Sequence, residues 1–148
     1  MSTATLKKSL GEAGAFFDDS NGEDNLLDVL TALCNTGEVI TFKDSASPPT
    51  TGYKASLVCD VASRIGTLYI NVGTTGTAGQ TDVDVYVNGS SVAQATIDHT
   101  DADGTSTGVS VDEDVDAGDL VEINVTAVAT GAANVTGTLR MKPVTVET

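Results

Sequence analysis

The chain has 148 residues and a formal net charge of −14; 40% of its residues are hydrophobic, only 4% are aromatic, and tryptophan is absent. Such a length predicts one compact domain with a short appendage. The chain lacks the cluster of lysines and arginines that binds phosphate backbones or anionic membranes, which argues against both kinds of partner.

Residues 1–37 are predicted to form an N-terminal arm and a short helix, separate from a β-domain over residues 38–148. The helix is indicated by an N-cap at Asp24 or Asn25 and by Gly37 after its end. Its apolar stripe consists of Leu26, Leu27, Leu30 and Leu33. The stripe must be buried against the β-domain, against a sister helix in a trimer, or against a larger host surface. No apolar run is long enough to predict a secretory signal or a membrane span.

From Glu38 onward, Val, Ile and Leu alternate with polar residues, the period-two pattern of half-buried antiparallel strands. The predicted strands are 39–43, 55–62, 66–73, 82–88, 91–97, 108–115, 120–129 and 134–142, with a further one possible at 144–147. About eight short strands separated by turns predict an all-β fold, an antiparallel sandwich resembling a jelly roll.

Turn residues and alternation also predict local details of this sandwich. Asn88-Gly89 is a strong hairpin signal because both residues tolerate positive φ, and 116–119 is a second turn. The inward-facing sets are Val83, Val85 and Val87; Val121, Ile123, Val125 and Ala127; Leu68, Ile70 and Val72; and Val135, Leu139 and Met141. The residues expected to face solvent or a neighbouring subunit are Asp82, Asp84, Glu122, Asn124 and Thr126.

The sequence predicts no catalytic, cofactor or metal site. In Asp98–Gly104, alignment with a calcium loop puts Asp101 and Asp103 at the third and fifth ligand positions, but His99 and Ser110 at the first and twelfth. A solvated polar loop is therefore preferred there, and for the acidic run 111–119 weak divalent binding is left open. A single histidine excludes a histidine metal cluster within one chain, and no nucleophile elbow or phosphate-binding loop occurs. A carboxylate pair for glycoside hydrolysis stays open.

Cys34 and Cys59 are the chain's two cysteines. Each is predicted to be a buried free thiol that packs as a small hydrophobic residue. A disulfide between them remains an alternative, because connectivity cannot be deduced from sequence alone.

Two stretches resemble a β-sandwich module of structural proteins from tailed bacteriophages and related viruses. They are GTLYINVGTTGTAGQTDVDVYVNGSSV and VDAGDLVEINVTAVATGAANVTGTLRMK, which lie within residues 64–142. The resemblance is to head decoration proteins, head fibres and some tail or baseplate appendages. It implies a non-enzymatic virion protein.

We therefore expect a capsid decoration (cement) or minor head protein on the outer surface of an icosahedral phage capsid. Its expected partners are the major capsid protein and further copies of itself in a homotrimer. The expected docking residues are Lys7, Lys8, Leu26, Leu27, Leu30 and Leu33. A receptor- or carbohydrate-binding module of a fibre or tail is the alternative, and a bacterial or archaeal surface adhesin domain is a weaker one.

Overall fold

The structure is a computed structural model, and it describes residues 37–144. The predicted N-terminal helix, Cys34 and residues 145–148 lie outside the described residues. The same holds for all six predicted docking residues, Lys7, Lys8, Leu26, Leu27, Leu30 and Leu33. The strand considered possible at 144–147 is described only at Val144, which is not part of a strand.

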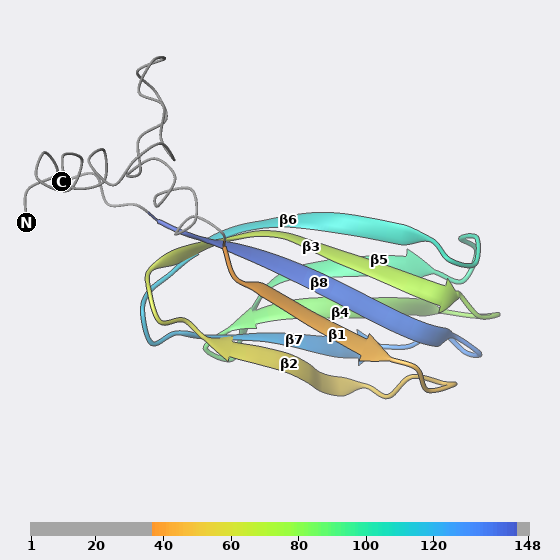
Figure 1. Cartoon of the computed structure of the whole chain (residues 1–148). Helices are drawn as coiled ribbons and strands as arrows, with labels where there is room; N and C mark the ends of the chain where they lie inside the picture. The colour runs from red at the N-terminus through yellow and green to blue at the C-terminus, as the bar shows by residue number, and fades with distance from the viewer. Residues whose placement is uncertain (1–36, 145–148) are drawn as a thin grey trace, which may run out of the picture. The chain divides into compact units, whose positions relative to one another are not determined.

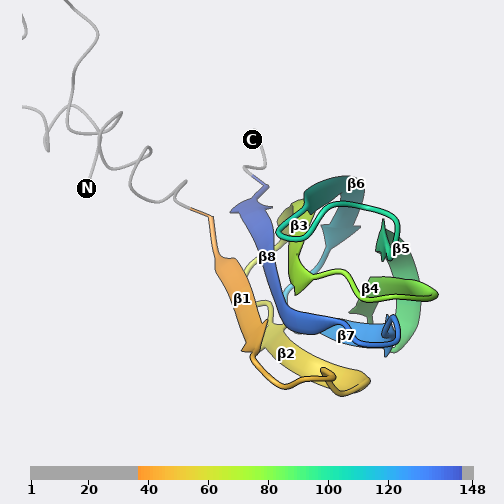
Figure 2. The ribbon, with the colours of Figure 1, turned by 90° about the vertical axis from the view of Figure 1, so that its right-hand side faces the viewer.

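Eight antiparallel strands form two four-stranded sheets (Figure 1). They are β1 (Val39–Asp44), β2 (Gly52–Val58), β3 (Ser63–Thr74), β4 (Gln80–Val87), β5 (Ser90–Asp98), β6 (Ser106–Val115), β7 (Leu120–Ala127) and β8 (Ala133–Pro143). Sheet A has the order β1-β8-β3-β6 and sheet B the order β2-β7-β4-β5. Seen along the strands, the sheets lie as two layers (Figure 2), so the predicted all-β sandwich is confirmed.

The strand order follows from four nested antiparallel pairs. β1 pairs with β8, β2 with β7, β3 with β6, and β4 with β5. This winding, in which the first strand meets the last and successive pairs nest inside, is that of a jelly roll. It brings residues from opposite ends of the domain onto neighbouring strands of sheet A.

The core lies between the sheets and is built from the inward-facing sets that alternation predicts. Leu68, Val83, Val125 and Leu139 are fully buried. Most of the other large core residues are valine and isoleucine, whose β-branched side chains pack well on a pleated surface. Phe42 is the one aromatic ring in the core of the described residues, and it lies over its cross-strand partner Gly137.

Cys59 is free and 2% exposed, as expected for a cysteine that packs as a small hydrophobic residue. Burial raises the pKa of its thiol, and the nearby carboxylates of Glu38, Asp119 and Asp60 act in the same direction. The prediction that strand 55–62 includes Cys59 is wrong. The backbone carbonyl of Cys59 accepts a hydrogen bond from Gly118 N–H, and the N–H of Cys59 donates to Asp119 O. Both groups are therefore bonded to the 116–119 turn, and β2 ends at Val58.

Asp82 and Asp84 are expected to face solvent or a neighbouring subunit, and the solvent alternative is only partly right. Both lie on the outer face of sheet B, yet each is only 7% exposed. Thr96 Oγ1 donates to Asp82 Oδ1 over 2.7 Å, and Gln94 Nε2 donates to Asp84 Oδ1 over 2.8 Å. Neighbouring polar side chains therefore cover these carboxylates and satisfy them.

The two ends of the sandwich differ in what they carry. One end, which we call the entry end, holds Gly37, Val144 and the turns 59–62, 88–89 and 116–119. The opposite end, the loop end, holds the loops 45–51, 75–79, 99–105 and 128–132. Asn88 (φ 49°) and Gly89 (φ 81°) form the predicted hairpin turn. Within residues 37–144 no helix has the length and apolar character needed to cross a membrane.

Candidate functional site

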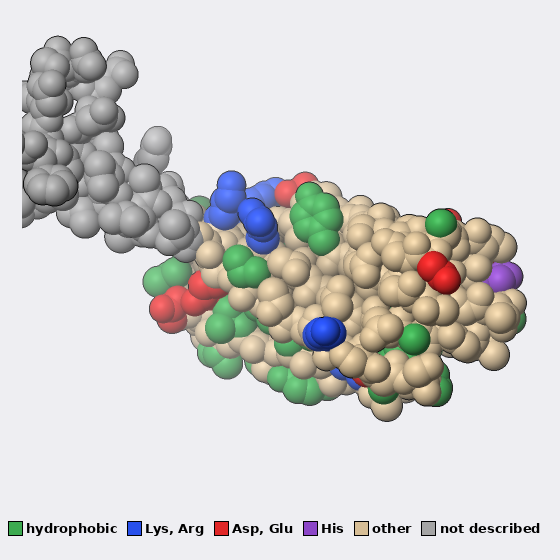
Figure 3. All heavy atoms as spheres, turned by 45° about the vertical axis from the view of Figure 1, so that its right-hand side comes forward, with side chains coloured by type: hydrophobic (Ala, Val, Ile, Leu, Met, Phe, Trp, Pro, Cys, Tyr) green, Lys and Arg blue, Asp and Glu red, His purple; other side chains and the backbone are tan. Residues whose placement is uncertain are grey.

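The outer face of sheet A has a hollow of about 810 Å³ near the entry end. It is lined by Arg64, Gly66, Thr67 and Tyr69 of β3, by Asp112 of β6, and by Arg140 and Lys142 of β8. Figure 3 shows a group of lysine and arginine side chains near one end of this face, beside apolar and acidic groups, and further cationic groups apart from it. In a chain of net charge −14, three of seven cationic side chains thus share one depression.

Two strand irregularities make the hollow. Ile65 and Leu68 are both fully buried, although strict alternation would separate inward residues by two positions. The register of β3 shifts between these residues against β8, and between Ile65 and Thr67 against β6. Gly66 lies in this bulge and has no side chain to fill the space. Bulges of this kind re-aim side chains and often lie beside functional sites.

A positive φ on β6 belongs to the same irregularity. Asp112 has φ 50°, a conformation that aspartate tolerates better than most residues. Its Oδ1 lies 3.7 Å from Arg64 Nε, while its Oδ2 accepts a hydrogen bond of 3.0 Å from Ser110 Oγ. The bulge on β6 therefore places a carboxylate beside the hollow.

Arg64 is held on one side by acidic residues of β6. Its Nη1 donates to Asp114 Oδ1 over 2.9 Å, and Asp114 is its cross-strand partner. On its other side the cross-strand partner is Lys142. Like charges directly opposite one another on neighbouring strands destabilise a sheet. A sequence that breaks a local rule in this way does so typically at a functional site.

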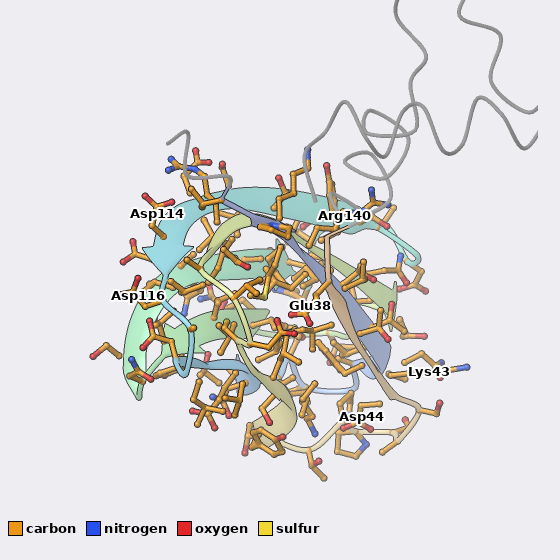
Figure 4. The ribbon with its side chains drawn as sticks, turned by 60° about the vertical axis from the view of Figure 1, so that its left-hand side comes forward. Glu38, Lys43, Asp44, Asp114, Asp116 and Arg140 are labelled. Atoms are coloured by element: carbon orange, nitrogen blue, oxygen red, sulfur yellow. The ribbon has the colours of Figure 1, made fainter. Side chains whose placement is uncertain are left out.

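Arg140 and Lys142 point outward from alternate positions of β8, with the buried Met141 between them. Within residues 37–144, the ion pairs of lysine and arginine involve Lys54 and Arg64, and none involves Arg140 or Lys142. Figure 4 shows Arg140 on the same face as Asp114 and far along the sheet from Lys43. Among the described residues, these two exposed cations thus have no acidic partner.

Tyr69 forms an apolar wall of the hollow. It is 53% exposed, and its ring leans over its cross-strand partner Gly108. A Cβ at Gly108 would lie 2.8 Å from Tyr69 Cε1, so only glycine leaves room for this ring position. The hollow therefore offers two cations and a well-positioned aromatic side chain, a set that suits an anionic ligand with apolar surface.

In the loop Asp98–Gly104, which aligns in part with a calcium loop, the aspartate carboxylates accept hydrogen bonds from nearby backbone N–H groups. Asp98 Oδ1 accepts from Thr100 N–H over 2.9 Å, Asp101 Oδ2 from Asp98 N–H over 3.0 Å, and Asp103 Oδ1 from Thr75 N–H over 2.9 Å. The hydrogen bonds from Thr100 lower the pKa of Asp98. In the described part of the chain, no three His, Cys, Asp or Glu side chains are grouped so that they could hold a metal ion.

The acidic run 111–119 is also engaged within the fold. Asp112 and Asp114 contact Arg64, and Asp119 closes the turn by accepting from Asp116 N–H over 2.8 Å. Asn88 Nδ2 donates to Asp119 Oδ1 over 2.8 Å, which ties the hairpin to this turn. These hydrogen bonds, first that from Asn88, lower the pKa of Asp119.

The sequence alone does not predict the hollow. No lysine or arginine occurs between Arg64 and Arg140, and this stretch therefore indicates no cationic site. The two residues that bound this stretch come together because β3 pairs with β8. One local signal was present. The apolar spacing of Ile65 and Leu68 departs from period two and indicates a bulge.

Comparisons with known proteins give no assignment. No family model matches the chain, and a search of curated proteins found no match. Among solved structures, the chain is similar to dimeric latent PorU from Porphyromonas gingivalis, with 10% identity and a TM-score of 0.39. That similarity covers 73% of this chain and 13% of the PorU chain, so this chain spans about an eighth of that structure.

Proposed function

We propose that this protein is a non-enzymatic virion structural protein, a decoration or minor head protein that binds the outside of an icosahedral phage capsid. The observation that carries the proposal is the position of the cationic hollow at the entry end. Met141, between Arg140 and Lys142, donates its backbone N–H to Glu38 O over 2.8 Å. Glu38, near the start of the described residues, thus lies directly beside the hollow.

Exposed apolar side chains at the same end support this proposal. Val39, Val58, Val61 and Val144 are between 44% and 59% exposed. Apolar and aromatic side chains together with arginine are typical of the centres of protein interfaces. The entry end, which also carries the acidic turn 116–119, would then face the coat, and the loop end would face solvent.

The proposed mechanism is mechanical. A small sandwich that bridges neighbouring coat subunits buries apolar area across joints that internal pressure would otherwise open. Several attachments, whether from a homotrimer or from separate contacts of one chain, turn modest individual affinities into strong overall binding. The jelly roll provides a rigid body for this role, but a fold alone does not define a function.

Titration of the purified full chain onto undecorated capsids tests the proposal. We expect saturable co-sedimentation and a higher temperature of capsid disruption, measured by light scattering, because ligands of the assembled state stabilise it. If neither binding nor stabilisation occurs, the protein is not a decoration protein.

Tyr69 in the hollow favours a second candidate, a receptor- or carbohydrate-binding module of a fibre or tail appendage. An exposed aromatic ring beside polar groups is a common element of small-ligand sites. A glycan array separates the two candidates: specific binding to a host glycan by a chain that ignores capsids would favour the second.

A further inference from the structure

Cations are rare on the described surface outside the hollow. Outside the hollow, the cationic side chains of residues 37–144 are Lys43 and Lys54, and Lys54 is bound to Asp44 over 2.6 Å. The loop end carries Asp98, Asp101 and Asp103. With a net charge of −14, the chain repels an acidic partner from most directions. The hollow, although bordered by Asp112 and Asp114, is the place on the described surface where cations lie together.

Arg140 and Lys142, the two cations of the hollow that form no ion pair within residues 37–144, have a regular spacing. Arg140 and Lys142 occupy alternate positions of one strand, so their Cα atoms are about 6.6 Å apart along the strand. An extended peptide repeats the same distance between alternate side chains. Carboxylates two residues apart on an extended segment therefore match these cations one to one, and arginine is suited to bidentate pairing with a carboxylate.

The surroundings of the cations fit a protein segment. Val39, the cross-strand partner of Arg140, is 54% exposed, and Val144 at the rim is 44% exposed. Tyr69 stands on the other side of the hollow. An extended chain lying across this face would bury apolar side chains on both sides of its ionic contacts, as protein interfaces do.

We propose that the hollow is a carboxylate-binding site that receives an extended acidic segment of a partner protein, with carboxylates two residues apart on Arg140 and Lys142. The identification of that partner as the coat protein rests on the proposed function, whereas the binding chemistry does not. Arg64 is paired with Asp112 and Asp114 and therefore forms no direct pair with the segment. Because acidic side chains outnumber cations on the rest of the described surface, this site also favours one orientation in which the sandwich docks.

A short acidic peptide tests the binding chemistry without any capsid. The probe is a six-residue peptide that alternates glutamate and serine, titrated into the isotope-labelled full chain and followed by amide chemical shifts. We expect shifts at Gly66, Tyr69 and Arg140. We also expect the affinity to fall several-fold as salt rises from low to physiological concentration, because exposed ion pairs are screened. A peptide with lysine in place of glutamate should leave these amides unchanged.

Charge reversal provides matched variants. R140E/K142E should weaken peptide binding about tenfold or more, because two exposed ion pairs become repulsive contacts. K43E changes the charge in the same direction on the same face, but outside the hollow, and should bind the peptide as the unmodified chain does. Both variants should retain the dispersed amide spectrum of the sandwich, because all three side chains are exposed.

The proposal is overturned if the acidic peptide leaves the hollow unshifted, if it shifts residues elsewhere, or if R140E/K142E binds it undiminished. It is equally overturned if a uronic acid oligosaccharide shifts the hollow and the peptide does not, since the ligand would then be a glycan. If the unmodified chain binds the peptide but does not bind capsids, the proposed function is refuted and the carboxylate-binding site is retained.

Discussion

Leu139→Ala is expected to lower the free energy of unfolding by about 3 kcal/mol, because it removes a fully buried side chain from the middle of sheet A. Leu139 lies on β8 between its cross-strand partners Ile40 of β1 and Leu68 of β3. Apolar side chains on both sides leave little freedom for the core to collapse into the cavity. Domains of this size are stable by only about 5–15 kcal/mol in total, so the loss is large.

Urea denaturation followed by circular dichroism measures this effect. Thr138→Ala is the matched control, since Thr138 neighbours Leu139 on β8 but lies on the outer face of the sheet. The control should cost about 1 kcal/mol or less. Equal losses for both variants would contradict the assignment of inward and outward faces on β8.

Asp44→Asn is expected to destabilise the sandwich by about 2 kcal/mol at neutral pH, because it removes a charged acceptor that binds several donors. Asp44 Oδ1 accepts from Ala46 N–H over 3.0 Å, and Oδ2 accepts from Thr50 N–H over 3.1 Å and from Lys54 Nζ over 2.6 Å. Asp44 ends β1 in sheet A, and Lys54 lies on β2 in sheet B. The ion pair therefore joins the two sheets at the loop end.

The stabilisation by Asp44 is expected to be present at neutral pH and to be lost in acid. The hydrogen bond from Lys54, followed by those from Ala46 and Thr50, holds the pKa of Asp44 far below its ordinary value. An aspartate in the unfolded chain titrates near 3.9, so the stabilisation by ionised Asp44 is complete above about pH 5. It is lost progressively as the pH falls below about 4, through the range between the unfolded and the folded pKa.

Thermal unfolding at a series of pH values checks this expectation. The difference between the unmodified chain and Asp44→Asn should be largest near pH 7 and should shrink toward pH 2. Asp60→Asn makes the same chemical change at an exposed side chain and should alter stability by about 0.5 kcal/mol or less. A pH-independent difference for Asp44→Asn would show that the ionised carboxylate is not the stabilising group.

The features predicted correctly are those that depend on local chemistry. Asn88-Gly89 forms the hairpin because both residues adopt positive φ there, whatever the rest of the chain does. The faces of β4 and β7 follow from period two, since a residue such as Val85 or Ile123 can lie inward only if its neighbours lie outward. Such information is present in short windows of sequence.

The features that were missed depend on pairing between distant segments. Cys59 ends β2 because its backbone bonds to the 116–119 turn, which no pattern near residue 59 reveals. Arg64 and Lys142 are 78 positions apart and meet only because β3 pairs with β8. The hollow also needs the bulges at Gly66 and Asp112, which interrupt the period on which the strand prediction relied. The candidate site therefore could not be assembled before the strand order was known.

The burial of Asp82 and Asp84 has a similar origin. Alternation places both on the outer face of sheet B, and both do lie there. Their low exposure comes from Gln94, Thr96 and Thr126 on neighbouring strands, whose side chains reach over and donate hydrogen bonds. The alternation along one strand predicts which face of the sheet a residue lies on. The exposed fraction of its side chain depends on the side chains of neighbouring strands.

An image of the decorated particle, at a resolution that shows strands, tests the central claim most directly, namely that the entry end, through its cationic hollow, attaches this sandwich to a larger assembly. We predict that Gly37, Arg140 and Lys142 face the shell and contact acidic side chains of the coat, while the loop that contains His99 points outward. Density in which the loop end touches the shell, or particles that stay bare at saturating protein, would contradict it.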